Sequence, residues 1–496
     1  MATAENTTMT SRLDHASRMR GRPSGQPAAS PFPLLRAVVA GPILLALGIA
    51  PASAEEPTCS AQALRCCELP AEAMTAQAPI RFGVHVWPSR LAQSPASVER
   101  LLALSPGDLR FSLGPNWRRQ PRLRPEMTDE ELDALVAESF TATRELASHV
   151  AVMKRLAATG IRLHLIVWEP PSMPGEPDFN VAGARRWRVL NSSDVQLAAR
   201  FQVANLRHIA ALGLPLHAME LSNEPDGSWN IKIGPSDYIA LVAAVRSEAA
   251  RRKVALPLIY GPGASRALAT RPFLAEPDKA RELLRLVDVF SLHGWGDPAG
   301  TAWGEDLEAL LQDLARLGPT PPIAVTEYGL TRIDPTRTEP NMTARNRVPD
   351  SVTTTPAYAG ASLAAFFRVF RGRIGEVMYW EFEDQSWGRS LFGLLDVEAQ
   401  PKPIYDIYRK VTQSIAELAP GGIGVAHDGR LAVLSGSGRR RAFVVNPSAS
   451  PLDVVLPADR APIGRANSCR AGPGEVGVQL PPGETLSIEL APRPMP

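Results

Sequence analysis

The chain has 496 residues, which is enough for one large domain with its own core and a second, smaller domain. Its 53 basic and 51 acidic residues give a net charge of +2, so the composition argues against nucleic acid or an anionic membrane as a partner.

The N-terminal region has the pattern of an export signal. Scattered arginines up to Arg36 precede an apolar run over residues 37–50, and the small residues Ala52-Ser53-Ala54 follow it. This order predicts a signal peptide over residues 1–54. A membrane anchor is the alternative, but the run is shorter than the roughly 20 residues that span a bilayer, and no other stretch is long enough. We therefore expect a secreted or periplasmic protein without a membrane span in the mature chain.

Between residues 80 and 420, apolar runs of strand length alternate with helical patterns. One helix is expected to begin at Thr128, which acidic residues follow, and to continue through Ala158. The alternation predicts a (β/α)8 TIM barrel. The strand-like runs are Ile80–Trp87, Leu109–Leu113, Ile161–Trp168, Leu216–Pro225, Pro257–Gly261, Val287–Trp295, Ile323–Tyr328 and Glu376–Phe382.

From residue 421 onward, the sequence changes to short apolar runs separated by turn residues. The runs cover residues 431–434, 441–445, 452–456 and 486–490. Short strands at this spacing predict a small C-terminal antiparallel β-sandwich domain over residues 421–496. A polar segment, residues 55–79, separates the signal peptide from the barrel.

Two of the predicted barrel strands end in a glutamate. The fourth ends at Asn223-Glu224-Pro225, where the proline stops the strand, and the seventh ends in Glu327. Because the carboxyl ends of parallel barrel strands surround one mouth, the two carboxylates should face each other there. Glycoside hydrolysis needs such a pair. A three-residue motif recurs by chance in a chain of this length, so its place in the strand series is what gives it weight.

Other side chains at the predicted mouth could bind a sugar. Arg110 on the second strand could direct its charge into the mouth or form a surface salt bridge. Trp168 and Trp380 end the third and eighth strands, where indoles could stack on pyranose faces, although core positions would also suit them. His293 and Trp295 on the sixth strand could hydrogen-bond a carboxylate or a hydroxyl, and His293 could equally be a packed histidine.

Three nearby polar residues are left outside the predicted site. Glu169 and Asp226 are interpreted as loop carboxylates, and His85 on the first strand is the weakest candidate. A metal-dependent barrel hydrolase would need a His-x-His pair after the first strand, where only His85 stands. A second alternative is a non-catalytic carbohydrate-binding or cell-wall scaffold protein on a glycosidase-like barrel, although the presence of both glutamates argues against it.

The strand ends resemble those of the clan A retaining glycoside hydrolases, and are most like those of family 30, which contains glucosylceramidases and xylanases. The string Trp168-Glu169-Pro170-Pro171-Ser172-Met173 resembles the Trp-Ser-Pro-Pro turn after the third strand of that family. Further matches are Arg110, His293, Trp380 and the tail Gln400-Pro401-Lys402-Pro403-Ile404-Tyr405.

Two positions depart from the family 30 pattern. Glu169 stands where the family has a serine. Trp295 stands where the family has a tyrosine that contacts the nucleophile, and an indole N–H can only donate a hydrogen bond. Families 39 and 5 of the same clan therefore stay open.

The resemblance implies a role for each matched residue. Glu327 would be the nucleophile and Glu224 the acid/base, with their carboxyls about 5–5.5 Å apart. Asn223 would hold the sugar 2-hydroxyl, and Arg110 would keep Glu327 ionised. The expected substrate is a β-linked oligosaccharide or polysaccharide, the protein is expected to be a monomer, and neither a metal nor an organic cofactor is implied.

All four cysteines, Cys59, Cys66, Cys67 and Cys469, lie in the exported part of the chain. An even number in an oxidising compartment suggests up to two disulfides, and adjacent Cys66 and Cys67 rarely bond each other. We expect residues 55–79 to pack on the β domain, as the N-terminal strand does in family 30, with Cys469 bonded to one of the other three cysteines. Without a Cys-x-x-Cys and a matching histidine pair, a zinc site is not predicted.

Overall fold

The computed structural model describes residues 59, 63–66, 69, 74–76, 79–117, 120–168, 170–174, 188–227, 230–296, 301–330, 353–385, 392–419, 421–460, 467–469 and 472–490. All of them belong to one unit of the chain, Glu56–Pro496. The predicted signal peptide, residues 1–54, lies outside the described residues and stays a prediction.

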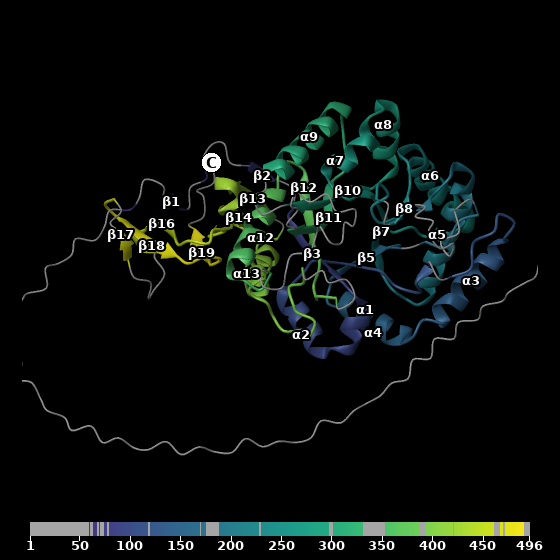
Figure 1. The fold of residues 1–496 in the computed structure, drawn as a ribbon, viewed down its shortest axis with the longest axis horizontal. Helices are drawn as coiled ribbons and strands as arrows, with labels where there is room; N and C mark the ends of the chain where they lie inside the picture. Colours follow the sequence, from purple (N-terminus) through teal and green to yellow (C-terminus); the bar gives the residue numbers. More distant parts are fainter. Residues whose placement is uncertain are drawn as a thin grey trace, which may run out of the picture. The chain divides into compact units, whose positions relative to one another are not determined.

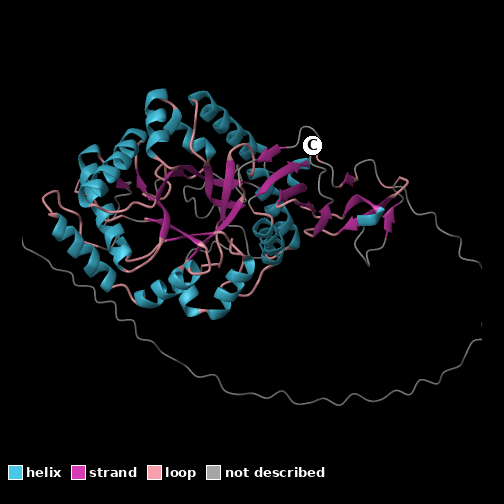
Figure 2. Ribbon diagram, turned by 180° about the vertical axis from the view of Figure 1, so that it is seen from behind, coloured by secondary structure: helices cyan, strands magenta, loops and turns pink. Residues whose placement is uncertain are grey.

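Eight apolar strands close into a barrel in which every neighbouring pair is parallel. Their order around the barrel follows the sequence, and the last strand pairs with the first. Figure 2 shows these strands inside a ring of helices. The predicted TIM barrel is therefore confirmed. The strands are β3 (Arg81–Val86), β4 (Asp108–Phe111), β5 (Arg162–Ile166), β7 (Leu216–Glu220), β9 (Leu258–Ala264), β10 (Val289–Gly296), β11 (Ile323–Leu330) and β12 (Ile374–Tyr379).

The helices that connect these strands cover the outside of the barrel (Figure 1). Their apolar sides bury residues such as Leu101, Phe201 and Phe366 against the strands. The helices are α1 (Pro88–Gln93), α2 (Pro95–Leu104), α3 (Asp129–Thr141), α4 (Leu146–Ala157), α5 (Val195–Ala211), α6 (Pro235–Arg252), α7 (Ala267–Thr270), α8 (Pro277–Leu286), α9 (Thr301–Leu317), α12 (Pro356–Val369) and α13 (Pro403–Glu417). A short parallel pair, β6 (Arg188–Val189) and β8 (Ile231–Lys232), joins two of the loops.

The helix expected from Thr128 to Ala158 is two helices, α3 and α4. Its start is as expected, because the Thr128 hydroxyl accepts from the Glu131 N–H and the Glu131 carboxylate accepts from the Thr128 N–H. The break follows Thr141, where the hydroxyls of Thr141 and Thr143 donate to carbonyls of the preceding turn. Glu145 then adopts a left-handed backbone with φ 60°, which no helix can continue.

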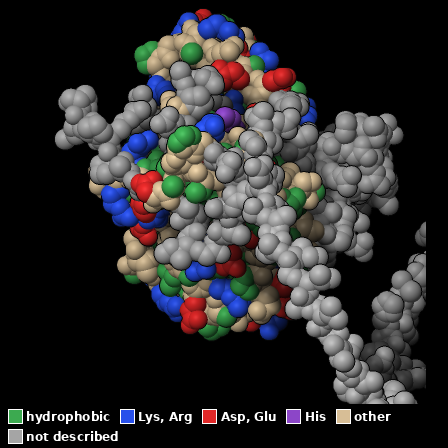
Figure 3. Space-filling view, turned by 90° about the vertical axis from the view of Figure 1, so that its left-hand side faces the viewer, with side chains coloured by type: hydrophobic (Ala, Val, Ile, Leu, Met, Phe, Trp, Pro, Cys, Tyr) green, Lys and Arg blue, Asp and Glu red, His purple; other side chains and the backbone are tan. Residues whose placement is uncertain are grey.

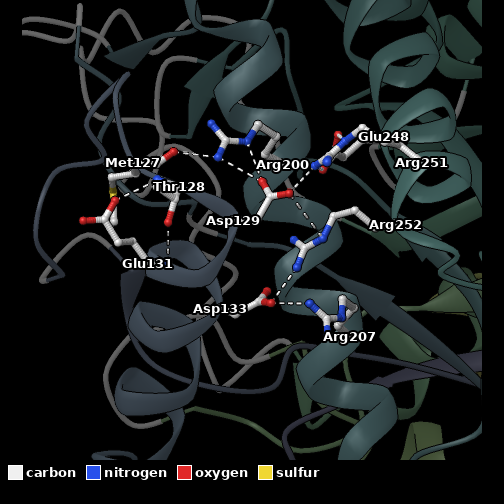
Figure 4. A network of polar contacts seen from close by, with 10 residues as sticks. All are labelled: Met127, Thr128, Asp129, Glu131, Asp133, Arg200, Arg207, Glu248, Arg251 and Arg252. Carbon is white, nitrogen blue, oxygen red and sulfur yellow. Dashed lines mark hydrogen bonds and ion pairs between the residues drawn. The ribbon is translucent and has the colours of Figure 1, made fainter.

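An ion-pair network fixes α3 against α5 and α6 (Figure 4). Asp129 of α3 lies 2.9 Å from Arg200 of α5 and also pairs with Arg251 of α6. Asp133 lies 2.5 Å from Arg252 and also pairs with Arg207. Isolated surface pairs contribute little, but several charges in one network support each other. The network therefore helps to hold α3 on its neighbours.

The C-terminal region forms two packed sheets, as predicted for a small β-sandwich. Two short strands from before the barrel complete them: β2 pairs antiparallel with β13, and β1 pairs parallel with β16. The antiparallel domain thus contains one parallel pair. One sheet has the order β19-β15-β14-β13-β2 and the other β1-β16-β18-β17. The strands are β1 (Leu64–Arg65), β2 (Met74–Ala76), β13 (Gly421–Ala426), β14 (Leu431–Gly436), β15 (Arg439–Val445), β16 (Leu452–Pro457), β17 (Asn467–Cys469), β18 (Glu475–Leu480) and β19 (Thr485–Leu490).

Helix α12 joins the barrel to the β domain through a close backbone contact. A Cβ atom on Gly360 would lie 2.4 Å from the carbonyl oxygen of Asn446, which is nearer than any side chain can approach. Beside it, the Phe367 and Phe443 rings lie 6.2 Å apart. The absent side chain at position 360 therefore lets the helix lie directly on the β domain.

Cys59 and Cys66 are not free thiols. Cys67 and the side chain of Cys469 lie outside the described residues, so the bond to Cys469 stays a prediction. Within the described ranges, no helix is both long enough and apolar enough to cross a bilayer. On the face drawn in Figure 3, basic and acidic side chains are interspersed, in keeping with the balanced net charge.

Candidate active site

Arg110 brings three elements of the barrel mouth together. It lies on β4, is 1% exposed, and its guanidinium has donors on several sides. Nη1 donates to Glu327 Oε1 at 2.5 Å, Nη2 to Asn223 Oδ1 at 2.8 Å, and Nε to Glu220 Oε2 at 2.7 Å. Arg110 is therefore a buried residue of the site, and the alternative of a surface salt bridge is excluded.

Glu220 at the end of β7 is a member of this cluster that the sequence interpretation missed. Ser291 Oγ donates to its Oε1 at 3.0 Å and Thr326 Oγ1 at 2.7 Å. Burial alone would raise the pKa of Glu220, but the charges of Arg110 and His293 and the hydrogen bonds from Thr326 and Arg110 lower it below its ordinary value. The sequence contained a signal for this position, because side chains alternate between the two faces of a strand. If Met219 and Leu221 point outward, Glu220 between them points into the barrel.

Glu224 lies beyond β7, in the loop rather than at the strand end expected from the sequence. Its φ is 45°, a left-handed backbone that is uncommon outside glycine. The Glu224 N–H donates to the Gly263 carbonyl at 3.1 Å, and its carbonyl accepts from the Gly227 N–H at 2.8 Å. These bonds hold the loop in a conformation that turns the carboxylate towards His293. Strained backbone of this kind is common at functional sites.

His293 connects the two predicted catalytic glutamates. Its Nδ1 lies 2.9 Å from Glu224 Oε1 and 3.3 Å from Glu327 Oε2. One carboxylate oxygen of each glutamate lies within 4.8 Å of the other. All three side chains are buried, with exposures of 0% for His293, 3% for Glu327 and 8% for Glu224. The structure thus brings Arg110, Asn223, Glu224, His293 and Glu327 into one cluster.

Burial and the neighbouring charges shift the pKa values of Glu327 and His293 in opposite directions. Burial raises the pKa of the Glu327 carboxyl above its ordinary value, and the nearby His293 and Arg110 only partly reverse this. Arg110 thus acts on Glu327 in the expected direction, by favouring the ionised carboxylate, but burial has the larger effect. Burial alone would lower the pKa of His293, but Glu327 and Glu224 raise it above its ordinary value. The protonation of His293 and that of Glu327 therefore depend on each other.

Three tryptophans surround His85 beside this cluster. The His85 ring lies 4.3 Å from Trp380, 4.9 Å from Trp87 and 6.0 Å from Trp168, centroid to centroid. Trp168 and Trp380 stack at 5.3 Å with an interplanar angle of 26°. Burial, with Arg110 and His293, lowers the pKa of His85 well below its ordinary value, so the ring is neutral. We call Trp87, Trp168 and Trp380 the tryptophan cluster.

The remaining candidates lie elsewhere. Trp295 continues the inward face of β10, but its indole packs over Gly329 and lies 5.4 Å from the Phe392 ring. Asp226 accepts from the backbone N–H of Ser265 at 2.8 Å and from its hydroxyl at 2.5 Å, so it fastens a loop. Glu169 lies outside the described residues.

Two groups of described residues have ligand atoms close enough for a metal ion. One is Glu224, His293 and Glu327, and the other is Asp108, His164 and Glu376 at the opposite end of the barrel. In each group an arginine already lies beside the carboxylates: Arg110 in the first, and Arg162, 2.5 Å from Asp108, in the second. In both groups a guanidinium thus already supplies positive charge next to at least one of the carboxyl groups.

Comparison with known proteins places this site on a shared fold. No family model matches the sequence, and no curated protein matches it. The structure is similar to SrfJ from Salmonella typhimurium, with 11% identity and a TM-score of 0.58 over 86% of this chain and 94% of that chain. It is similar to the family 30 subfamily 8 xylanase Xyn30A from Clostridium acetobutylicum, with 14% identity and a TM-score of 0.53 over 84% and 97% of the chains.

A family 39 glycoside hydrolase from the gut symbiont Bacteroides cellulosilyticus WH2 is also similar, with 15% identity and a TM-score of 0.51 over 84% of this chain and 81% of that chain. Identities this low show a common fold and no more. At that level, the resemblance to clan A glycoside hydrolases, with families 30 and 39 both represented, is confirmed.

Proposed function

We propose that the chain is a retaining glycoside hydrolase that cleaves β-linked glycosides or polysaccharides through a glycosyl-enzyme intermediate. The observation that carries this proposal is the buried pair of Glu224 and Glu327, with carboxylate oxygens within 4.8 Å. Retaining enzymes hold their carboxyls about 5–5.5 Å apart, whereas inverting enzymes need about 6.5–9.5 Å to admit a water molecule. The close spacing supports retention.

Glu327 is the better candidate for the nucleophile. Its two oxygens face two nitrogen donors, Arg110 Nη1 and His293 Nδ1, which favour the carboxylate that must attack the anomeric carbon. The same donors would stabilise the carboxylate again when the intermediate is hydrolysed.

Glu224 is assigned as the acid/base. In the first step it would donate a proton to the departing oxygen, and in the second it would take one from water. His293 contacts both carboxylates and would hold Glu224 in place throughout.

Two further groups suit a sugar in this position. Asn223 Oδ1 accepts from Arg110, which leaves its amide N–H groups to donate to the 2-hydroxyl. The stacked pair Trp168 and Trp380 offers an apolar wall for the C–H face of a pyranose. A β-linked substrate is proposed because one similar structure is by name a xylanase. Export is proposed from the N-terminal signal pattern.

The test is the stereochemistry of hydrolysis. The protein is incubated with aryl β-glycosides and β-linked polysaccharides, and the first anomer released from an active substrate is identified by proton NMR. A β-anomer supports retention, and an α-anomer contradicts it. If no substrate is cleaved but oligosaccharides bind, the alternative of a non-catalytic carbohydrate-binding protein stands instead.

A further inference from the structure

A hydrogen bond between Glu381 and Trp87 connects two sides of the tryptophan cluster. Glu381 directly follows Trp380 after β12, and its Oε2 accepts from Trp87 Nε1 at 2.6 Å. Trp87 follows β3, the neighbour of β12 in the barrel. The indoles at the ends of these two strands are thus joined by a polar contact in addition to the packing of their rings.

The backbone around Glu381 is fixed on two sides. The Phe382 N–H donates to the His85 carbonyl at 2.9 Å, which ties the segment to β3. The Glu381 carbonyl accepts from the Leu394 N–H at 3.1 Å. Because Glu381 is also only 1% exposed, its carboxyl group has little freedom to move away from the indole.

The carboxyl group of Glu381 is suited to accept this bond without carrying a charge. Burial raises its pKa well above the ordinary value, and the charges of Asp384 and Glu327 act in the same direction. The Trp87 hydrogen bond and the charge of Lys402 lower the pKa, but Lys402 is paired with Asp384. An uncharged carboxyl group still accepts through its carbonyl oxygen, and it adds no further negative charge near Glu327.

Trp87 in turn supports the stacked pair of Trp168 and Trp380. Its ring lies 6.0 Å from each of them, at an interplanar angle of 55° to Trp168 and 81° to Trp380. Tilted and edge-to-face contacts of this kind depend on the orientation of the rings. Trp87 and Trp168 also line a cavity of about 420 Å³, so this side of the cluster faces open space. A change in the orientation of Trp87 should therefore alter the surface that the cluster presents.

We propose that Glu381 is a positioning residue, which holds the Trp87 indole in place and, through it, the stacked pair of Trp168 and Trp380. This inference rests on the proposed glycosidase function and adds to it a residue that acts without touching the reacting atoms. Glu381 serves as a hydrogen-bond acceptor and not as an acid, a base or a charge. An amide in its place should therefore work equally well, whereas an apolar side chain should not.

The test compares Glu381→Gln, which keeps an acceptor oxygen, with Glu381→Leu, which removes it. Trp87→Phe removes the donor but keeps an aromatic ring, and the double variant of Trp87→Phe and Glu381→Leu completes a double-mutant cycle. Glu383→Leu is the matched control, because Glu383 is a buried acid of the same segment that pairs with Arg90 rather than with a tryptophan. Thermal unfolding shows which variants are folded, and Trp87→Phe keeps the test valid if Glu381→Leu does not fold.

The constants KM and kcat are measured with the aryl β-glycoside that the wild type cleaves best. Glu381→Leu and Trp87→Phe should each raise KM about three- to tenfold, the effect of one hydrogen bond, with little change in kcat. The double variant should be no worse than either single variant. Glu383→Leu should keep the wild-type KM. Glu381→Gln should keep both the KM and the pH profile of kcat/KM.

Three kinetic results would overturn the inference: an unchanged KM in Glu381→Leu and Trp87→Phe, additive effects in the double variant, or a KM in Glu381→Gln as high as that in Glu381→Leu. A pH profile that shifts in Glu381→Gln would do so as well, because it would mean that Glu381 acts through its charge.

The position of the rings is measured separately from activity. In protein with isotope-labelled indole groups, the NMR signal of the Trp168 N–H is identified by its loss in Trp168→Phe. It should move in Glu381→Leu and stay in place in Glu381→Gln. A signal that stays in place in both variants, or moves equally in both, would overturn the inference. If the wild type cleaves nothing, the proposed function fails separately, and this measurement still decides whether Glu381 positions the cluster.

Discussion

Arg110 and Glu327 form an ion pair in the barrel mouth, with Nη1 2.5 Å from Oε1 and both side chains at least 97% buried. The same guanidinium also binds Glu220, whose pKa is lowered, whereas burial raises the pKa of Glu327. The Arg110 guanidinium is thus divided between Glu220 and Glu327, the proposed nucleophile. This division determines how the activity should depend on pH.

The first prediction concerns the acid limb of the pH profile. A nucleophilic Glu327 must be deprotonated, so activity is lost as pH falls through its pKa. Because that pKa is raised, the acid limb of kcat/KM should lie above pH 4.5, the ordinary value for glutamate. Arg110→Gln should move the limb upward by about 1 unit or more, since an opposite charge at this distance is removed. Arg110→Lys, which keeps the charge, should move it less. A limb that stays in place in Arg110→Gln would count against the pairing.

The second prediction separates the roles of the two glutamates. Glu224→Ala should still form the intermediate from an activated aryl glycoside but hydrolyse it slowly, because the base is missing. Azide needs no base, so it should restore turnover and give the β-glycosyl azide. Azide with Glu327→Ala should instead give the α-azide, by direct attack on the vacated face. NMR of the two products checks this, and exchanged stereochemistry would mean that the roles are reversed.

The third prediction uses the cluster at the other end of the barrel. Burial raises the pKa of Asp108 and of Glu376 to about 8 each, while Arg162 lies 2.5 Å from Asp108 and 2.9 Å from Glu376. The folded protein therefore holds protons that the unfolded chain has released, and its free energy of unfolding should fall as pH rises from about 4 to about 8.

Denaturant titrations at several pH values between about 4 and about 8 measure how the free energy of unfolding changes with pH. Glu376→Gln should flatten this dependence, because the amide does not ionise yet its oxygen can still accept from Arg162 and Tyr260. The exposed Glu282→Gln is the control for the loss of a carboxyl group. A wild-type stability that rises steadily from pH 4 to pH 8 would contradict the prediction.

The fourth prediction concerns the contact of α12 with the β domain. Gly360→Ala should destabilise the protein by about 1–3 kcal/mol, because the added methyl group would meet the Asn446 carbonyl. Gly304→Ala is the matched helical control, since the nearest atom to its new Cβ, Arg371 Nη2, is 4.0 Å away. That variant should be as stable as the wild type or more stable by up to about 1 kcal/mol. Equal midpoints of thermal unfolding for both variants would show that the helix can move away.

Much of the fold could be predicted because the barrel depends on local patterns that repeat. Apolar runs followed by helical periodicity identify each strand, and strand-end position singled out Glu224 and Glu327. The strands β1 and β2 were not visible, since two or three residues carry no period and their order comes from partners far along the chain. Glu220 could be placed on the inward face of its strand by alternation, but its role was missed because its partner Arg110 lies on another strand.

The arrangement of the tryptophan cluster also could not be predicted from local sequence patterns. Trp168 and Trp380 could be chosen individually as strand-end aromatics, but their stacking and the place of His85 between them depend on barrel closure. The neutral state of His85 likewise follows from burial beside Arg110 and His293, which no local pattern reports. Contacts between distant strands were therefore beyond reach of the sequence, whereas the approximate place of each strand along the chain was not.

The most direct test of the proposed mechanism is to trap the intermediate. The protein is treated with a 2,4-dinitrophenyl 2-deoxy-2-fluoro-β-glycoside matching the best substrate. The fluorine slows both formation and hydrolysis of the glycosyl-enzyme, and the activated leaving group restores only the rate of formation, so the intermediate accumulates. Peptide mapping by mass spectrometry then locates the label. We predict one sugar per chain, attached to Glu327, and none in Glu327→Gln. A label on Glu224, or an unlabelled protein that releases the inverted sugar from its substrate, would contradict a retaining mechanism with Glu327 as nucleophile.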